Sequence, residues 1–177
     1  MRSTDDDSIL TNICENVKTM LLSLPPEKWG TIVPGNDIEG KIDIQLGLDP
    51  DEIVKATKRT LFIMPVILNY MIQDSASSRG RTKTSVLTTA LISTAIVIPF
   101  KSFMRGDVCN WDEVRSIIKF RERLETNIMA NDLKDANFGY EYSFKDCEPE
   151  APVEIELNQR NYVAVTDYTF ELNKCVR

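Results

Sequence analysis

The sequence contains no histidine among its 177 residues. Histidine carries protons most readily near neutral pH, and it is the usual base for serine and cysteine nucleophiles. Its absence excludes Ser-His and Cys-His catalysis and leaves carboxylate pairs as the main route to acid–base chemistry. The sequence therefore predicts a protein that is not an enzyme and has no small-molecule substrate.

Cysteine and glycine are also scarce, with four and seven residues. No two cysteines lie closer than 28 positions, whereas zinc sites take paired nearby ligands. We expect free thiols in a reducing compartment. The glycines form neither a GxxxxGK[ST] nor a GxGxxG motif, so no nucleotide cradle is indicated. The densest carboxylate cluster, Asp49, Asp51 and Glu52, is explained as a helix start, and no metal or cofactor is expected.

Two long stretches lack charge, namely residues 61–73 and 84–100. The second has 17 residues, slightly short for a membrane-spanning helix, and it contains six serine or threonine residues. We interpret it as a buried helix, or as a helix leading into a strand at 95–98. A basic signal-peptide start is missing, because Asp5, Asp6 and Asp7 stand there. We expect an intracellular chain that is not secreted and has no transmembrane helix.

Apolar periodicity predicts helices over 8–24, from Pro50 through Leu61, and from Trp111 to about residue 130. Pro65 is expected to kink or end a helix. Alternating patterns predict an early strand over 38–48 and short strands at 140–144, 153–157, 162–165 and 168–172, with a hairpin loop at 158–161. The expected fold class is α+β: three to four helices, an early strand and a C-terminal antiparallel β-sheet. We expect a single domain over 1–177, with residues 1–7 as a short acidic arm.

Charge is distributed unevenly along the chain. Residues 1–52 carry 11 acidic and 4 basic side chains, residues 53–131 carry 6 and 12, and residues 132–177 carry 10 and 5. The middle is therefore basic between acidic flanks. Charge compensation between packed elements is one explanation, and a basic face for phosphate is another. A third is head-to-tail self-association through faces of opposite charge.

Two basic segments are candidates for binding an anionic partner. One is a polar loop around Gly80, where arginine forks could match phosphate geometry. The other is a helical ridge whose members are spaced by four residues. Either could instead be an ordinary solvated surface, with intrahelical ion pairs on the ridge. The candidate residues are Arg79, Arg81 and Lys83 in the loop, and Arg115, Lys119 and Arg123 on the ridge.

The size, the order of elements, the absence of a signal and the basic, apolar middle resemble the matrix proteins of negative-strand RNA viruses, especially the short ones of plant rhabdoviruses. Two family features are missing: Asp5 to Asp7 replace a lysine-rich arm, and Pro25-Pro26-Glu27-Lys28 lacks the tyrosine of a PPxY motif. Both differences favour assembly over membrane budding.

The resemblance implies a structural protein of the virion and the host cytoplasm. It would self-associate as a homo-oligomer and bind a viral nucleoprotein, RNA or an anionic membrane surface. The alternative is a monomeric virulence or silencing-suppressor protein that binds a host factor through an apolar groove between helices.

Overall fold

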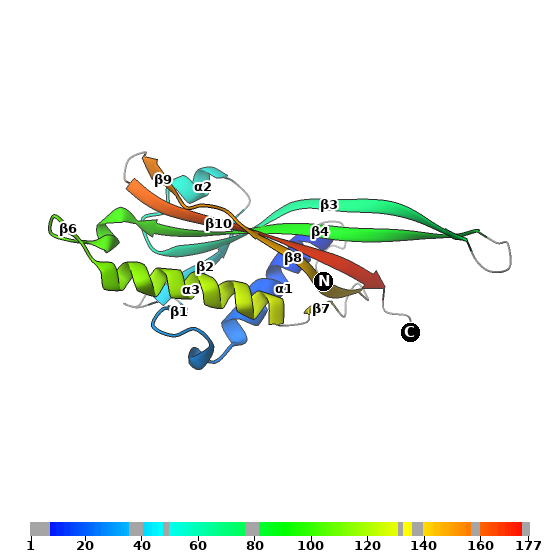
Figure 1. Cartoon of the computed structure of the whole chain (residues 1–177), viewed down its shortest axis with the longest axis horizontal. Helices are drawn as coiled ribbons and strands as arrows, with labels where there is room; N and C mark the ends of the chain where they lie inside the picture. The colour runs from blue at the N-terminus through cyan, green and yellow to red at the C-terminus, as the bar shows by residue number, and fades with distance from the viewer. Residues whose placement is uncertain are drawn as a thin grey trace, which may run out of the picture.

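The computed structural model describes residues 8–35, 41–47, 50–76, 82–130, 133–135, 140–156 and 160–174. Figure 1 shows an elongated molecule with a long strand pair projecting from a body of sheet and helices. The elements are α1 (Ile9–Ser23), η1 (Pro26–Lys28), β1 (Val33–Pro34), β2 (Lys41–Leu46), α2 (Pro50–Val54), β3 (Thr60–Ala76), β4 (Thr82–Pro99), η2 (Phe100–Phe103), β5 (Met104–Arg105), β6 (Val108–Cys109), α3 (Trp111–Ala130), β7 (Leu133–Asp135), β8 (Tyr140–Pro149), β9 (Val153–Glu156) and β10 (Arg160–Lys174).

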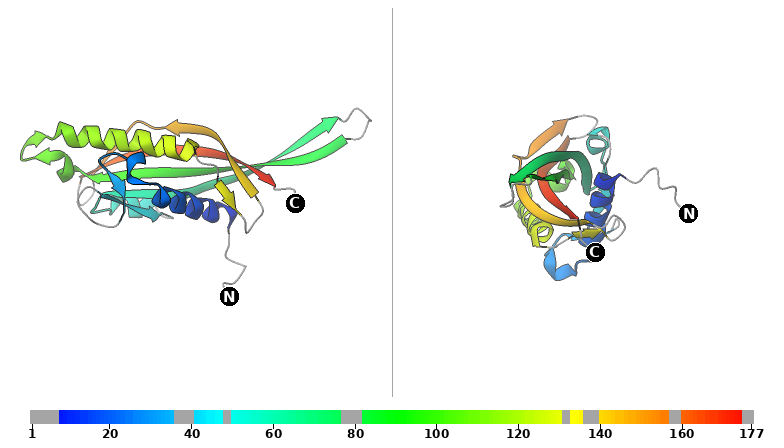
Figure 2. Two further views of the ribbon diagram at one scale, coloured as in Figure 1. Left: turned by 90° about the horizontal axis from the view of Figure 1, so that it is seen from below. Right: turned by 90° about the vertical axis from the view of Figure 1, so that its right-hand side faces the viewer.

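The described strands form a curled sheet of eight and a separate hairpin of β5 and β6 (Figure 2). The sheet runs β1-β2-β3-β4-β10-β8-β7, and β9 also pairs with β10. β1, β2 and β3 are parallel neighbours, and the other pairs are antiparallel. The predicted α+β class, with helices through the first three-quarters of the chain, is therefore wrong. The protein is mainly β, and its described residues form three α-helices against a large mixed sheet.

The error arose in the two uncharged stretches, which form β3 and β4 rather than helices. A continuous apolar run has the same appearance in a buried strand and a buried helix, and β-branched residues favour the strand. Pro65, expected to break a helix, instead lies where the β3–β4 register shifts between Pro65 and Ile67. A proline cannot donate to the ladder, and such an irregularity tolerates the missing donor.

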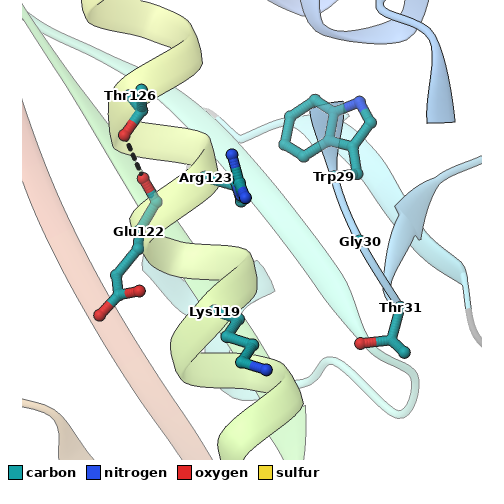
Figure 3. Close-up of a pocket in the computed structure, with 7 residues that line it drawn as sticks. All are labelled: Trp29, Gly30, Thr31, Lys119, Glu122, Arg123 and Thr126. Atoms are coloured by element: carbon teal, nitrogen blue, oxygen red, sulfur yellow. Dashed lines mark hydrogen bonds between the residues drawn. The ribbon is translucent and has the colours of Figure 1, made fainter. Parts of the chain in front are cut away.

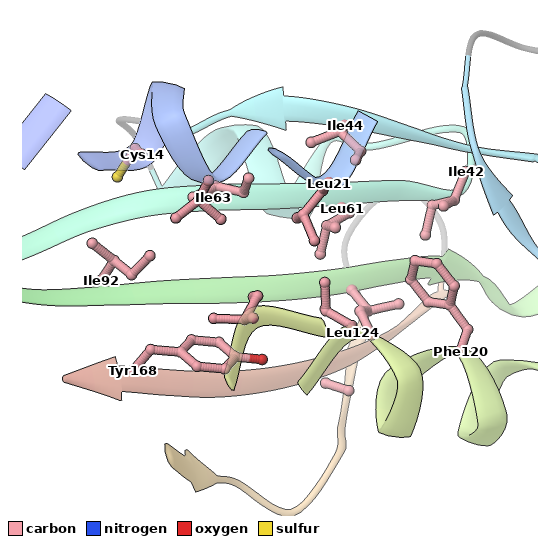
Figure 4. Packing of buried hydrophobic residues seen from close by; sticks show 14 of the residues in the cluster. Cys14, Leu21, Ile42, Ile44, Leu61, Ile63, Ile92, Phe120, Leu124 and Tyr168 are labelled. Carbon is pink, nitrogen blue, oxygen red and sulfur yellow. The ribbon is translucent and has the colours of Figure 1, made fainter. Parts of the chain in front are cut away.

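Both faces of the sheet are buried near the helices, which explains why these strands carry apolar residues at consecutive positions. On one face, Leu61, Ile63 and Ile92 pack with α1 and α3, as Figure 4 shows. On the other face, Phe62 and Val97 pack with Ile53 of α2 in a smaller cluster. These parts of β3 and β4 are therefore buried from two sides.

The predicted helices at 8–24 and 111–130 are confirmed as α1 and α3, and the early strand is confirmed as β2. The helix from Pro50 is confirmed only at its start, because α2 ends at Val54. The strands expected at 162–165 and 168–172 are one continuous strand, β10. Residues 1–7 and 157–159 lie outside the described residues, so the acidic N-terminal arm and the first half of the hairpin loop stay predictions. Arg160 and Asn161, expected in that loop, belong to β10.

Among the described residues, no other strand pairs with β3 beyond Ile63 or with β4 before Thr88. β2 pairs with β3 only over Thr60–Ile63, and β10 pairs with β4 only from Thr88 onward. We call this outer part of the β3–β4 pair, residues 66–76 and 82–87, the arm. Figures 1 and 2 show it extending away from the helices along the long axis.

Candidate functional site

The basic loop predicted from the sequence lies mostly outside the described residues. Arg79 and Arg81 fall in the segment 77–81, and Lys83 belongs to β4 without a described side chain. Their binding to an anionic partner stays a prediction.

The basic ridge lies on α3, and the structure brings two of its three members together. Lys119 and Arg123 line a hollow of about 600 Å³ between α3 and the segment that follows η1 (Figure 3). Arg115 does not line it; this side chain is 73% exposed and lies 3.5 Å from the Asp112 carboxylate. Each step of four residues turns about 40° around a helix axis, so the ridge drifts away from the hollow.

The hollow is built by a loop held against α3. The Trp29 ring is buried and stacks on Phe120, with ring centroids 5.4 Å apart. Asn127 donates a hydrogen bond from Nδ2 to the Lys28 carbonyl at 3.4 Å. Gly30 turns the chain with φ +90°, a conformation that side chains with a Cβ rarely adopt. These contacts hold the loop from Trp29 to Thr31 opposite Lys119 and Arg123.

Two positive side chains and one negative side chain line the hollow. In Figure 3, Lys119 and Arg123 extend toward Thr31 and Trp29, whereas the Glu122 carboxylate points away from them. Among the residues that the structure describes, neither Lys119 nor Arg123 forms an ion pair. An arginine fork beside an ammonium group and a threonine hydroxyl can bind a phosphate or carboxylate.

Arg121 of α3 is turned toward the sheet. Its guanidinium donates to the carbonyls of Val165 at 2.7 Å and Glu150 at 2.8 Å, and it pairs with Glu125 at 3.2 Å. The sequence spacing indicates this orientation, because position 121 lies between the buried positions 117 and 124 on one face of the helix. Arg121 therefore fastens α3 to β10.

Exposed apolar side chains form a second kind of candidate surface. Six large ones lie on the arm, and four lie around η2, β6 and the start of α3. Beside the latter is an apolar groove of about 230 Å³. The arm residues are Val66, Ile67, Tyr70, Met71, Ile72 and Val86; the others are Met104, Val108, Trp111 and Ile118.

Metal and thiol chemistry find little support in the described parts of the chain. No group of three or more His, Cys, Asp or Glu side chains there could hold a metal ion. Asp51 and Glu52 lie in the first turn of α2, as a helix start requires, and Asp49 lies outside the described residues. Burial raises the pKa of Cys14 to about 12 and that of Cys147 to about 11, so both thiols resist ionisation at neutral pH.

The comparisons with known proteins add no relative. No protein-family model matches the chain, and no curated protein matches its sequence significantly. Across the described segments, we find no helix with the length and apolar character needed to cross a membrane.

Proposed function

We propose that the chain is a non-enzymatic assembly protein, of the viral matrix type, that self-associates and binds an anionic partner such as a nucleocapsid, RNA or a membrane surface. The observation that carries this proposal is the arm, a β-ribbon with large apolar side chains on both faces and no described element over its outer part. The anionic partner is supported by the hollow that contains Lys119 and Arg123.

Large apolar side chains lie on both faces of the arm and are exposed. Cross-strand partners share a face, so Tyr70, Ile72 and Val86 lie on one side, and Ile67 and Met71 lie on the other. Tyr70 is 65% exposed and Ile72 is 69% exposed. Monomeric proteins rarely expose contiguous apolar patches above roughly a few hundred Å², and larger ones mark interaction sites. We infer that another protein surface covers the arm.

Light scattering across a concentration series tests self-association. We expect the mean mass to rise with concentration, because the exposed apolar area of the arm is removed from water when copies associate. A strict monomer up to high concentration would contradict the proposal. That outcome would favour the alternative, a monomeric binder of a host factor, for which the apolar groove between η2 and α3 is the supporting observation.

The anionic partner is tested by titrating a labelled single-stranded RNA of about 20 nucleotides at several salt concentrations. The slope of log affinity against log salt is negative. Replacing both Lys119 and Arg123 by glutamine should reduce its magnitude by about 1.4, since each lost phosphate contact removes about 0.7. Arg115→Gln is the matched control and should change the slope less, because Arg115 lies outside the hollow.

Vesicles with and without phosphatidylserine, titrated in parallel, distinguish a membrane surface from RNA. Affinity for both probes that does not change between about 50 and 200 mM salt would overturn the electrostatic part of the proposal, because phosphate contacts weaken steeply with salt.

A further inference from the structure

Exposed apolar side chains gather at two opposite ends of this elongated molecule. Of the thirteen large ones among the described residues, six lie on the arm and four lie around the groove at the start of α3. Figure 1 places β6 and the start of α3 at one end of the long axis and the arm at the other, and Figure 2 agrees. One chain thus carries two separate apolar surfaces that face in opposite directions.

The groove has the shape and chemistry of a receptor for apolar side chains. Its lining comes from η2, β5, β6, α3 and β10, and the lining residues are apolar apart from the thiol of Cys109 and the hydroxyl of Tyr162. Phe103 stacks edge-on against Tyr162, with ring centroids 5.4 Å apart, and forms part of this lining. Ile118 lines the groove and is 48% exposed, and Trp111, the first residue of α3, is 66% exposed. A volume of about 230 Å³ has room for one or two large side chains.

The arm presents side chains that suit this groove. Tyr70 and Ile72 project from one face of a narrow ribbon, with Val86 directly opposite Ile72 on β4. No described residue of the arm between positions 66 and 72 carries a charge, so insertion would leave no unpaired charge behind. A tyrosine beside aliphatic side chains is also typical of interface anchors.

We propose that the groove is the docking site for the arm of a second copy of this chain, in a head-to-tail contact that rests on the self-association part of the proposed function. The face with Tyr70, Ile72 and Val86 enters the groove beside Ile118 and covers Trp111. Because donor and acceptor surfaces differ, the contact is heterologous, and each added copy offers a new free arm and a new free groove. Such contacts build rings or open filaments.

A symmetric contact between two arms is the main competitor. It would also use the free edges of β3 and β4, since edge strands readily pair with another chain. It would leave the groove and its four exposed neighbours uncovered, whereas the head-to-tail contact covers both apolar surfaces with one interface.

Complementation between two assembly-deficient variants tests the proposal. An arm variant with Tyr70→Glu and Ile72→Glu, and a groove variant with Ile118→Glu, should each remain monomeric by light scattering where the wild-type protein assembles. Mixed together, they should form a 1:1 heterodimer and nothing larger, because only one intact arm and one intact groove remain. Leu22→Glu on α1 and Met129→Glu on α3 are matched controls, exposed positions away from both surfaces, and should assemble like the wild type.

Each other outcome has a distinct meaning. If the wild-type protein stays monomeric at high concentration, the proposed function fails as well. If the wild type assembles but the arm variant also does, only the docking proposal is overturned. A third outcome is that the arm variant stays monomeric, the groove variant assembles and the mixture forms no heterodimer. In that case the arms of two copies pair with each other. Circular dichroism of each variant confirms that a loss of assembly is not a loss of folding.

A disulfide trap gives a second readout with a cysteine that the groove already contains. Cys109 is exposed and lines the groove. In a background with Cys175→Ser, Val86→Cys, on the face of the arm that enters the groove, should give a ladder of disulfide-linked multimers under mild oxidation at about pH 8. Adding Cys109→Ser should abolish the ladder. The raised pKa values of Cys14 and Cys147 leave these thiols almost entirely protonated at this pH, so they react slowly. A ladder that persists without Cys109 would contradict the assigned groove.

Discussion

Arg121 and Arg123 are the same residue type two positions apart on α3, and the fold gives them different roles. Arg121 is 16% exposed and donates to backbone carbonyls of β10 and of the segment before β9. Arg123 is exposed and faces the hollow. A guanidinium directed at fixed carbonyls holds two elements together, whereas an unpaired one is available to a ligand.

Replacing Arg121 by alanine should lower the free energy of unfolding by about 2–4 kcal/mol, because the carbonyl of Val165 and the partly buried Glu125 lose a charged donor. Arg121→Lys should recover part of this loss, since it keeps the charge without the fork. Arg123→Ala is the matched control and should change the free energy by less than about 0.5 kcal/mol. Urea unfolding followed by circular dichroism measures all three; equal effects at 121 and 123 would contradict the assignment.

At the scale of the element, β3 is one strand with two environments. Its first residues, Thr60 to Ile63, are buried between the helices on one face and α2 on the other, and its outer residues lie on the exposed arm. Sequence alone did not separate these halves, because the uncharged stretch 61–73 runs from the buried part into the arm. The helix prediction for β3 and β4 failed for the same reason: with no polar face, periodicity carries no information.

Two isoleucines of β3 allow a direct comparison of these environments. Ile63→Ala should lower the free energy of unfolding by about 2–5 kcal/mol, because it leaves a cavity in a fully buried site. Ile72→Ala, at a position 69% exposed, should change it by less than about 0.5 kcal/mol at a concentration where the protein is monomeric. Thermal unfolding at low concentration measures both. A large loss at Ile72 would mean that the arm is part of the folding core.

At the scale of the whole molecule, the surfaces proposed for assembly and for anion binding are separate. The hollow with Lys119 and Arg123 lies on α3 beside Trp29, away from the lining of the groove. Self-association would therefore align many hollows along one polyanion without blocking them. Linked sites bind more tightly than single ones by about 10²–10⁴-fold when they can engage together.

This separation predicts that the arm variant Tyr70→Glu, Ile72→Glu loses affinity only for long anions. On an RNA of about 100 nucleotides it should bind at least roughly tenfold more weakly than the wild type, because avidity is lost. On an RNA of about 8 nucleotides, which engages a single copy, the two should bind alike. Fluorescence anisotropy at constant salt compares them; equal weakening on both lengths would place the arm in the anion site itself.

Much of the local structure could be predicted from the sequence alone. α1, α3 and β2 follow from amphipathic periodicity and helix-start residues, which act between near neighbours within an element. The absence of histidine excluded Ser-His and Cys-His catalysis. The uncharged stretches indicated segments that are buried by other elements.

Only the tertiary structure decided which elements bury these segments. Long-range pairing with β10 made β4 a strand, and the end of that pairing at Thr88 left the arm exposed. The groove combines residues from Phe100 to Tyr162, and the hollow joins Trp29 to Arg123, so neither could be assembled from spacing along the chain. Side-chain periodicity determines the face of an element, but burial and charge pairing depend on elements distant in sequence.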